Sequence, residues 1–103
     1  MKKFLVLYTG SKSAKEQMAQ STPEQGKKGM EMWMAWMKKT GAALVDGGSP
    51  LGPLGAASAK IGGYSILQAE SEKALDQLLK DHPHRMAPGA AIEVHEFLQM
   101  PGM

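Results

Sequence analysis

Residues 81–97 read DHPHRMAPGAAIEVHEF, and this stretch sets the organisation of the chain. It closes a helical pattern, because Pro83 disfavours helical backbone in the residue before it. It then turns through a second proline and a glycine and enters an apolar run that predicts a strand over 91–98. The same stretch contains all three histidines of the sequence: His82, His84 and His95. It therefore predicts both the last helix-to-strand connection and the neighbourhood of a functional site.

The length and composition indicate a single globular domain over residues 1–103. The hydrophobic share of 43% and the charged share of 21% are ordinary for such a domain. The sequence has no cysteine, which excludes disulfides and thiolate chemistry. The apolar run at 4–8 is too short for a membrane span or a secretion signal, so we expect a cytoplasmic protein without membrane contact. A net charge of +2 with a single arginine predicts no nucleic-acid partner.

Outward from residues 81–97, four segments have the composition of strands and are separated by turn signals: 4–8, 42–46, 61–69 and 91–98. In the third segment, Gly62 and Gly63 permit a bulge. Residues 51–59 are mostly Gly, Ala, Pro and Ser, which predicts a loop.

Two long helical patterns lie between these strands. The first follows Thr22 as N-cap, with Pro23 at the first helical position and Gln25 completing a capping box, and it ends at Gly41. The second begins after Ser71 and ends by His82, and its buried stripe is Ala74, Leu75, Leu78 and Leu79. A short helix is also predicted over 14–20.

The order strand, helix, strand, strand, helix, strand predicts an α+β fold of the ferredoxin-like βαββαβ kind, with an antiparallel sheet and the helices on one face. Apolar side chains alternate onto both faces of the first strand, and two helices cover one face only. We therefore expect a homodimer in which a second copy covers the other face, giving a dimeric α+β barrel.

The long helix is apolar over more of its circumference than one sheet can cover. Met30, Trp33, Met34 and Met37 have the spacing of a core stripe. Met32 and Trp36 lie off that stripe, which predicts a second buried contact with a partner subunit or a pocket. The alternative is a core helix with an exposed pair.

The histidines supply the candidate chemistry. Asp81 precedes His82, so the carboxylate can orient the imidazole as a general acid–base group. The alternative is that both side chains satisfy loose backbone groups at the helix end. His95 lies on the same strand face as Glu93. The two side chains could form a second polar pair inside a barrel, or His95 could simply be hydrogen-bonded. His-Pro-His is not a zinc-ligand spacing, so we expect no metal and no cofactor.

Five segments together resemble the YCII-related domain family over nearly the whole chain: GMEMWMAW at 29–36, LVDGGSPLG at 44–52, GYSILQAES at 63–71, LLKDHPH at 78–84 and IEVHE at 92–96. The resemblance implies a small bacterial ferredoxin-like dimer with a pocket associated with a histidine and an aspartate. Asp81 matches that aspartate. The family histidine of the first helix is absent, and Glu31 stands in its neighbourhood. Another branch of the family has an Asp-Gly-Pro-Phe motif. This chain has Asp-Gly-Gly-Ser at the corresponding place, from Asp46 to Ser49.

We therefore expect a small polar or aromatic molecule in a dimer pocket, with Asp81 and His82 as the catalytic pair in proton-transfer or lyase-like chemistry. The expected ligand-binding side chains are His84, His95, Glu31, Trp33, Trp36, Tyr64 and Ser49. Two alternatives stay open: a ligand-binding or accessory dimer without catalysis, and a structural dimer that acts through the Trp/Met surface of the long helix.

Overall fold

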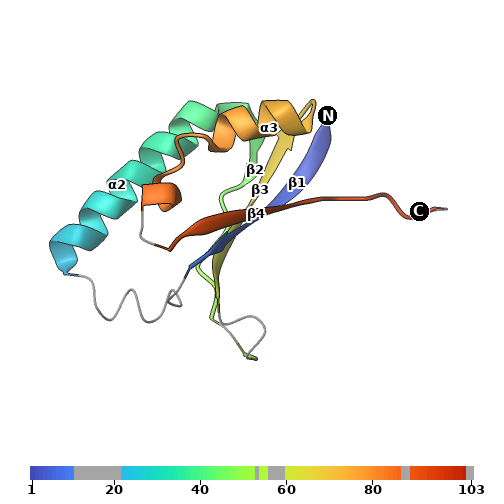
Figure 1. The fold of residues 1–103 in the computed structure, drawn as a ribbon. Coiled ribbons are helices and arrows are strands. Elements are labelled where there is room, and N and C mark those ends of the chain that lie inside the picture. Colours follow the sequence, from blue (N-terminus) through green and yellow to red (C-terminus); the bar gives the residue numbers. More distant parts are fainter. Residues whose placement is uncertain (11–21, 53, 56–59, 87–88, 102–103) are drawn as a thin grey trace.

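The computed structural model describes residues 1–10, 22–52, 54–55, 60–86 and 89–101. Its elements are β1 (Lys2–Thr9), α2 (Pro23–Thr40), the 3-10 helix η1 (Gly41–Ala43), β2 (Leu44–Asp46), β3 (Ile61–Ala69), α3 (Glu72–Leu79), the 3-10 helix η3 (Pro83–Met86) and β4 (Ala91–Glu96). Both α-helices lie on one side of the sheet (Figure 1). The predicted ferredoxin-like α+β fold is confirmed. The short helix predicted over 14–20 falls outside the described residues.

The sheet is antiparallel, and its strand order is β2-β3-β1-β4. At the centre, Val6 on β1 lies between Ser65 on β3 and Val94 on β4. Tyr8 pairs with Gly63 while the next residue pairs with Ile61, so Gly62 is the extra residue of the predicted bulge. β1 is central because both of its edges are paired, but only Phe4, Val6 and Tyr8 are buried; Leu5 and Leu7, on the other face, are half-buried.

The predicted caps form. The Gln25 amide donates to Thr22 Oγ1 at 3.2 Å and the Thr22 amide to Gln25 Oε1 at 3.0 Å, which closes the capping box. Gly41, with φ 60°, ends α2. The Ala74 amide donates to Ser71 Oγ at 3.1 Å and caps α3. Neither of these α-helices has the apolar length that crossing a bilayer requires.

The core-facing stripe of α2 differs from the one expected. Met30 and Met34 are 61% and 59% exposed, whereas Trp36 is 5% exposed. The side chains packed toward the sheet are those of Trp33, Trp36, Met37 and Thr40, which also follow i, i+3, i+4, i+7 spacing. The choice between the two stripes follows from size and polarity: the tryptophans bury more apolar surface than the methionines, and Trp36 Nε1 donates to Leu78 O at 3.0 Å on α3. Trp36 therefore belongs to the core of its own chain.

Several boundaries also differ. β1 runs from Lys2 to Thr9, beyond the predicted 4–8. Residues 41–43 form η1, so β2 begins at Leu44 instead of residue 42. β4 ends at Glu96, two residues before the predicted end. α3 ends at Leu79, as the predicted end by His82 requires, and the turn that follows contains η3.

The two faces of the sheet are buried to different degrees. On the helix side, Phe4, Val6, Tyr8 and Leu67 are at most 4% exposed and form the core with α2 and α3. The opposite face, which we call the open face, carries Leu5, Leu7, Tyr64, Ile66 and, on β4, Glu93 and His95. No helix of the described residues lies over it (Figure 1).

Candidate functional site

A cavity of about 740 Å³ lies where α2 passes the ends of β1 and β3 and the turn after β2. This volume is within the range of small-molecule sites. Its lining comes from all of these elements and from η3: Tyr8, Thr9, Gly10, Thr22, Pro23, Gln25, Gly26, Gly29, Met30, Trp33, Met37, Gly47, Gly48, Ser49, Pro50, Gly62, Gly63, Tyr64 and His84.

One stripe of α2 forms the helical wall of the cavity. Gly26, Gly29, Met30, Trp33 and Met37 repeat at helical spacing on that side. A Cβ added at either glycine would meet no atom within 4 Å, so the two glycines leave the space open. Sequence reasoning identified only Trp33 of this wall. The signal that could have found the rest is two glycines three residues apart in a strongly capped helix, where glycine lowers stability.

The turn after β2 forms the opposite wall, and backbone contacts hold it. The Gly48 amide donates to Asp46 Oδ1 at 2.8 Å, and the Tyr64 amide donates to Ser49 O at 3.3 Å. Gly48 has φ 79° and lies so close to β3 that a Cβ there would fall 1.6 Å from Tyr64 O. Backbone and small side chains therefore line this wall beside Ser49.

His84 contributes the imidazole of the cavity lining. Its Nε2 lies 2.7 Å from Thr9 O and 3.1 Å from Ala91 O. Carbonyl oxygens only accept hydrogen bonds, so Nε2 carries a hydrogen and donates to both. In the neutral ring, Nδ1 then has the free lone pair. The bonds to the end of β1 and the start of β4 fix the orientation of the ring, and Nδ1 is the atom that can accept a proton.

His82 lies behind the cavity and is 1% exposed. Three aromatic rings surround it, with centroids 4.7 Å (Tyr8), 4.5 Å (Trp33) and 4.2 Å (Trp36) from its own. Its Nδ1 accepts the amide hydrogen of His84 at 3.0 Å, and its Nε2 has no hydrogen-bond partner among the described residues. Burial, followed by the nearby charges of His84 and Arg85, lowers the pKa of His82 to about 3. The ring is therefore neutral near pH 7 and positions the backbone of His84.

The structure separates the other predicted site residues. The Asp81 carboxylate is at the surface, 3.5 Å from Lys39 Nζ, and neither nitrogen of His82 bonds to it. His95 is on the open face, where its Nε2 lies 3.5 Å from Glu93 Oε1. Glu31 is exposed on α2 and is not part of the lining. The cavity brings together His84, Trp33 and Ser49, while Trp36 is in the core beside it. Tyr64 also borders the cavity, where its backbone meets the turn after β2, but its side chain is on the open face.

Tyr8 and Ser65 connect the cavity to the sheet. The Tyr8 hydroxyl donates to Ser65 Oγ at 2.9 Å, and Ser65 Oγ donates to Gly47 O at 3.0 Å. Burial raises the pKa of Tyr8 to about 12, although the Ser65 hydrogen bond acts in the opposite direction. Tyr8 is therefore a neutral hydrogen-bonding wall of the cavity near pH 7.

Replacing Ser65 with alanine is expected to lower the free energy of unfolding by about 1–3 kcal/mol, because it leaves the buried Tyr8 hydroxyl and Gly47 carbonyl without this partner. Urea titration measures the change. The control is Ser49→Ala: Ser49 is exposed and bonds only locally, to Pro50 O, so its loss is expected to be within about 0.5 kcal/mol. Equal losses in the two variants would contradict a specific role for the buried pair.

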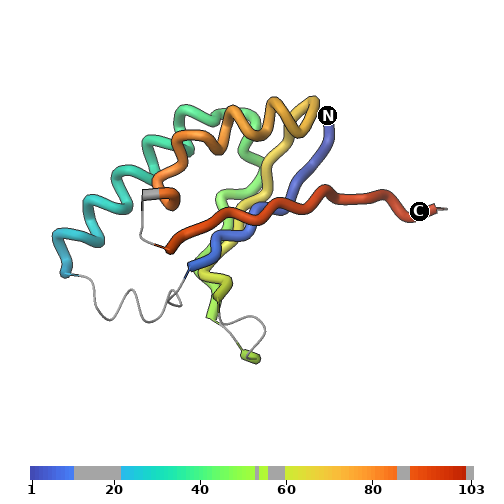
Figure 2. Tube along the Cα trace, viewed as in Figure 1, coloured from blue at the N-terminus to red at the C-terminus, as the bar shows by residue number. Residues whose placement is uncertain are grey.

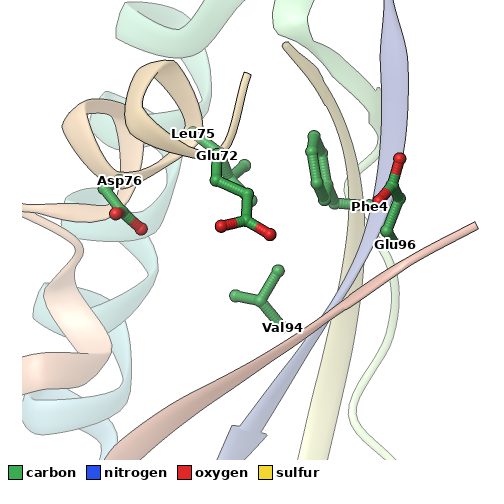
Figure 3. Close-up of a pocket in the computed structure, with 6 residues that line it drawn as sticks. All are labelled: Phe4, Glu72, Leu75, Asp76, Val94 and Glu96. Atoms are coloured by element: carbon green, nitrogen blue, oxygen red, sulfur yellow. The ribbon is translucent and has the colours of Figure 1, made fainter. Parts of the chain in front are cut away.

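A smaller cavity of about 220 Å³ lies between α3 and β4. Figure 3 shows Glu72 of α3 pointing toward Val94 of β4, and Phe4, Leu75, Asp76 and Glu96 complete the lining. Among the described residues, no group of three or more His, Cys, Asp or Glu side chains is arranged to hold a metal ion. The histidine-bearing cavity is therefore the better candidate site.

The strand order and the helices on one face define a ferredoxin-like α+β protein. No protein-family model matches this chain, and no curated protein does. Among solved structures, the chain is similar to 5-chloro-2-hydroxyhydroquinone dehydrochlorinase from Burkholderia phenoliruptrix AC1100, in a complex with 2,5-dihydroxybenzoquinone. The two share 16% sequence identity over 95% of each chain, with a TM-score of 0.59. At this identity the similarity shows the fold alone.

Proposed function

We propose that this protein binds a small, uncharged aromatic or polar molecule in the cavity between α2 and the turn after β2. The main support for the proposal is the composition of the cavity lining. Trp33, Met30 and Met37 offer an apolar wall, the glycine-rich turn offers a backbone surface, and His84 is the one lining residue with an imidazole. No Asp, Glu, Lys or Arg of the described residues lines this space, which favours a ligand without full charge.

A cavity-filling substitution tests this binding. Gly29→Leu places a side chain into open space on the cavity wall, so the affinity for a bound ring is expected to fall about tenfold or more. The matched control is Ala35→Leu, which adds the same side chain to an exposed position of α2 outside the lining. Tryptophan fluorescence can follow titration with the uncharged rings phenol, catechol and hydroquinone, and benzoate is the charged comparison that is expected to bind more weakly. Binding that is equal in both variants, or absent in the unmodified protein, would reject this cavity as the site.

We further propose that catalysis, where it occurs, is proton transfer through His84. Its Nδ1 takes a proton from a hydroxyl or an activated carbon of the bound ring, and Nε2–H stays hydrogen-bonded to the two carbonyls in both protonation states. His82 fixes the backbone of His84 by accepting the His84 amide hydrogen at Nδ1. Dehydrochlorination by the similar structure is chemistry of this general acid–base kind. Catalytic roles for Asp81 and His82 themselves, and membership of the YCII-related family, stay predictions.

His84→Gln separates binding from proton transfer. The glutamine amide can still donate to the carbonyls but has no nitrogen that titrates near neutral pH. Turnover of a reactive hydroxyquinone is expected to fall about a hundredfold or more, with the ligand affinity and melting temperature nearly unchanged. An active His84→Gln variant would remove His84 from the chemistry. Binding without turnover by the unmodified protein would favour the alternative, a ligand-binding or accessory module, which fits a cavity with a single imidazole.

The open face supports the proposal of a homodimer. Leu5, Leu7 and Ile66 are only partly buried there, and the helices of the described residues cover the other side. A second copy that stacks its own open face on this one would remove these apolar side chains from water. In such a dimer His95 and Glu93 would lie between the two sheets, whereas the cavity beside His84 would remain on the helix side. A cytoplasmic location stays a prediction.

A further inference from the structure

The residues that follow β4 expose apolar side chains. Phe97, Leu98 and Met100 are 49%, 81% and 66% exposed. The Phe97 amide donates to Lys3 O at 2.9 Å, and this bond continues the ladder between β4 and β1 by one residue. Beyond it the chain runs away from the sheet and both helices (Figure 2). We call residues 97–100 the arm.

The open face is small for a stable dimer. The strands β1, β2, β3 and β4 have eight, three, nine and six residues, and at a rise of about 3.3 Å per residue and a spacing of about 4.8 Å they cover about 400 Å² in plan. A stable protein–protein interface buries about 800 Å² on each partner. A stack of two such small sheets is at the small end of stable interfaces, and apolar surface from elsewhere on the chain would enlarge it.

The arm is continuous with the open face. Strand alternation places Phe97 on the same side as His95 and Leu5, so its ring extends the open face beyond the last paired residue of β4. No residue from Phe97 to Met100 carries a charge, so burying the arm has no cost of charge desolvation. The arm therefore offers apolar surface next to the open face, where a molecule stacked on that face would lie.

We infer that the arm of each copy packs beside the stacked sheets, against the margin of a second copy's open face, and completes the dimer interface. The inference rests on the proposed homodimer and identifies the segment that decides its stability. By two-fold symmetry, both arms are buried in the same way, each next to the Leu5, Leu7 and Ile66 side chains that the stacked sheets cover.

Light scattering after gel filtration, at several protein concentrations, measures the dimer dissociation constant. Comparing arm variants with a variant of the open face shows which of the two surfaces the dimer needs. The arm variant carries Phe97→Ser, Leu98→Ser and Met100→Ser, and its dimer dissociation constant is expected to rise about tenfold or more. Met34→Ser, at a similarly exposed methionine on α2, is the control and should leave this constant unchanged. Circular dichroism confirms that each variant is folded. If Ile66→Lys gives monomers while the arm variant dimerises like the unmodified protein, the arm inference is wrong and the dimer stands. An unmodified protein that is monomeric throughout would overturn both.

The position of the arm can be measured directly, because the sequence has no cysteine. A spin label on Leu98→Cys, mixed with unlabelled ¹⁵N protein, is expected to broaden the amide signals of Leu5, Leu7 and Ile66 in the second copy. Broadening confined to residues of α2 and α3 would place the arm on the helix side and contradict the inference.

Discussion

Between pH 7 and pH 4, the free energy of unfolding is expected to fall by about 3 kcal/mol because of His82 alone. The pKa of this imidazole is about 3 in the folded protein and 6.5 in the unfolded chain. As the pH falls below 6.5, the unfolded chain therefore binds a proton that the folded protein does not, which favours unfolding. Each pH unit in this window contributes about 1.4 kcal/mol, and the contribution levels off near pH 3.

The physical cause is the environment of the ring. Tyr8, Trp33 and Trp36 exclude water from it, and Nε2 has no acceptor among the described residues to stabilise a second proton. A charged imidazolium there would also face the charges of His84 and Arg85. Neutral histidine can donate Nε2–H toward an aromatic ring, which is a weak interaction.

Urea titrations at pH 7 and pH 4 of the unmodified protein and of His82→Phe measure this effect. Phenylalanine keeps an aromatic ring in the cluster and removes the titration, at a cost of about 1 kcal/mol for the lost acceptor of the His84 amide. The variant is expected to be the less stable protein at pH 7 and the more stable one at pH 4. Parallel pH dependences in the two proteins would show that His82 takes up its proton in the folded state.

Gly48→Ala is expected to lower the free energy of unfolding by about 3–5 kcal/mol. With φ at 79°, an alanine is strained, and its Cβ would lie 1.6 Å from Tyr64 O and 2.6 Å from Tyr64 C. Both atoms belong to the backbone of β3. Because β3 is hydrogen-bonded to β1 along its length, these atoms cannot shift to make room for the Cβ. The turn itself must move away, which breaks the bond from the Tyr64 amide to Ser49 O and opens one wall of the cavity.

Substitutions at two other glycines separate the steric clash of the added Cβ from the strain of a positive φ. Gly52→Ala is expected to change stability little, because its Cβ meets no atom within 4 Å and its φ is not positive. Gly41→Ala isolates the conformational strain, about 1–3 kcal/mol, because φ is 60° there and the space is open. In thermal and urea unfolding, Gly48→Ala should lose the most free energy of unfolding, Gly41→Ala less and Gly52→Ala the least. A Gly48 variant no worse than the Gly41 variant would mean that the turn tolerates displacement from β3.

The fold was largely predictable because its signals are local. Thr22 and Gln25 form the capping box that their spacing predicts, and Ser71 caps the second helix. Gly62 is the bulge residue, and the apolar run of β1 corresponds to the central strand. Each of these features depends on residues within a few positions of one another, or on the period of a single element. The helix stripe was predicted only in part: Trp33 and Met37 pack against the core as expected, but Trp36 takes the place expected for the exposed methionines. Two phases of α2 are apolar, and contact with α3 and β1 selects one of them.

The candidate site was predictable only in part. Trp33, Tyr64, Ser49 and His84 were expected to bind a ligand, and all four line the cavity. Which histidine borders the cavity was not predictable, because His82 and His84 are separated by one residue and look alike in the sequence. The 3-10 turn at Pro83–Met86 directs His82 into the aromatic cluster and places His84 against Thr9 and Ala91.

The sequence by itself determined where the chain is helical, where it is extended and where it must turn, since caps, prolines, glycines and apolar periodicity act over short distances. The tertiary structure decided which imidazole is buried and neutral, which one borders a cavity and which one lies on the open face. Those outcomes depend on burial and on hydrogen-bond partners such as Thr9 O, which is 75 residues away from His84 along the chain. Desolvation is a property of the packed protein, and no local pattern of residues encodes it.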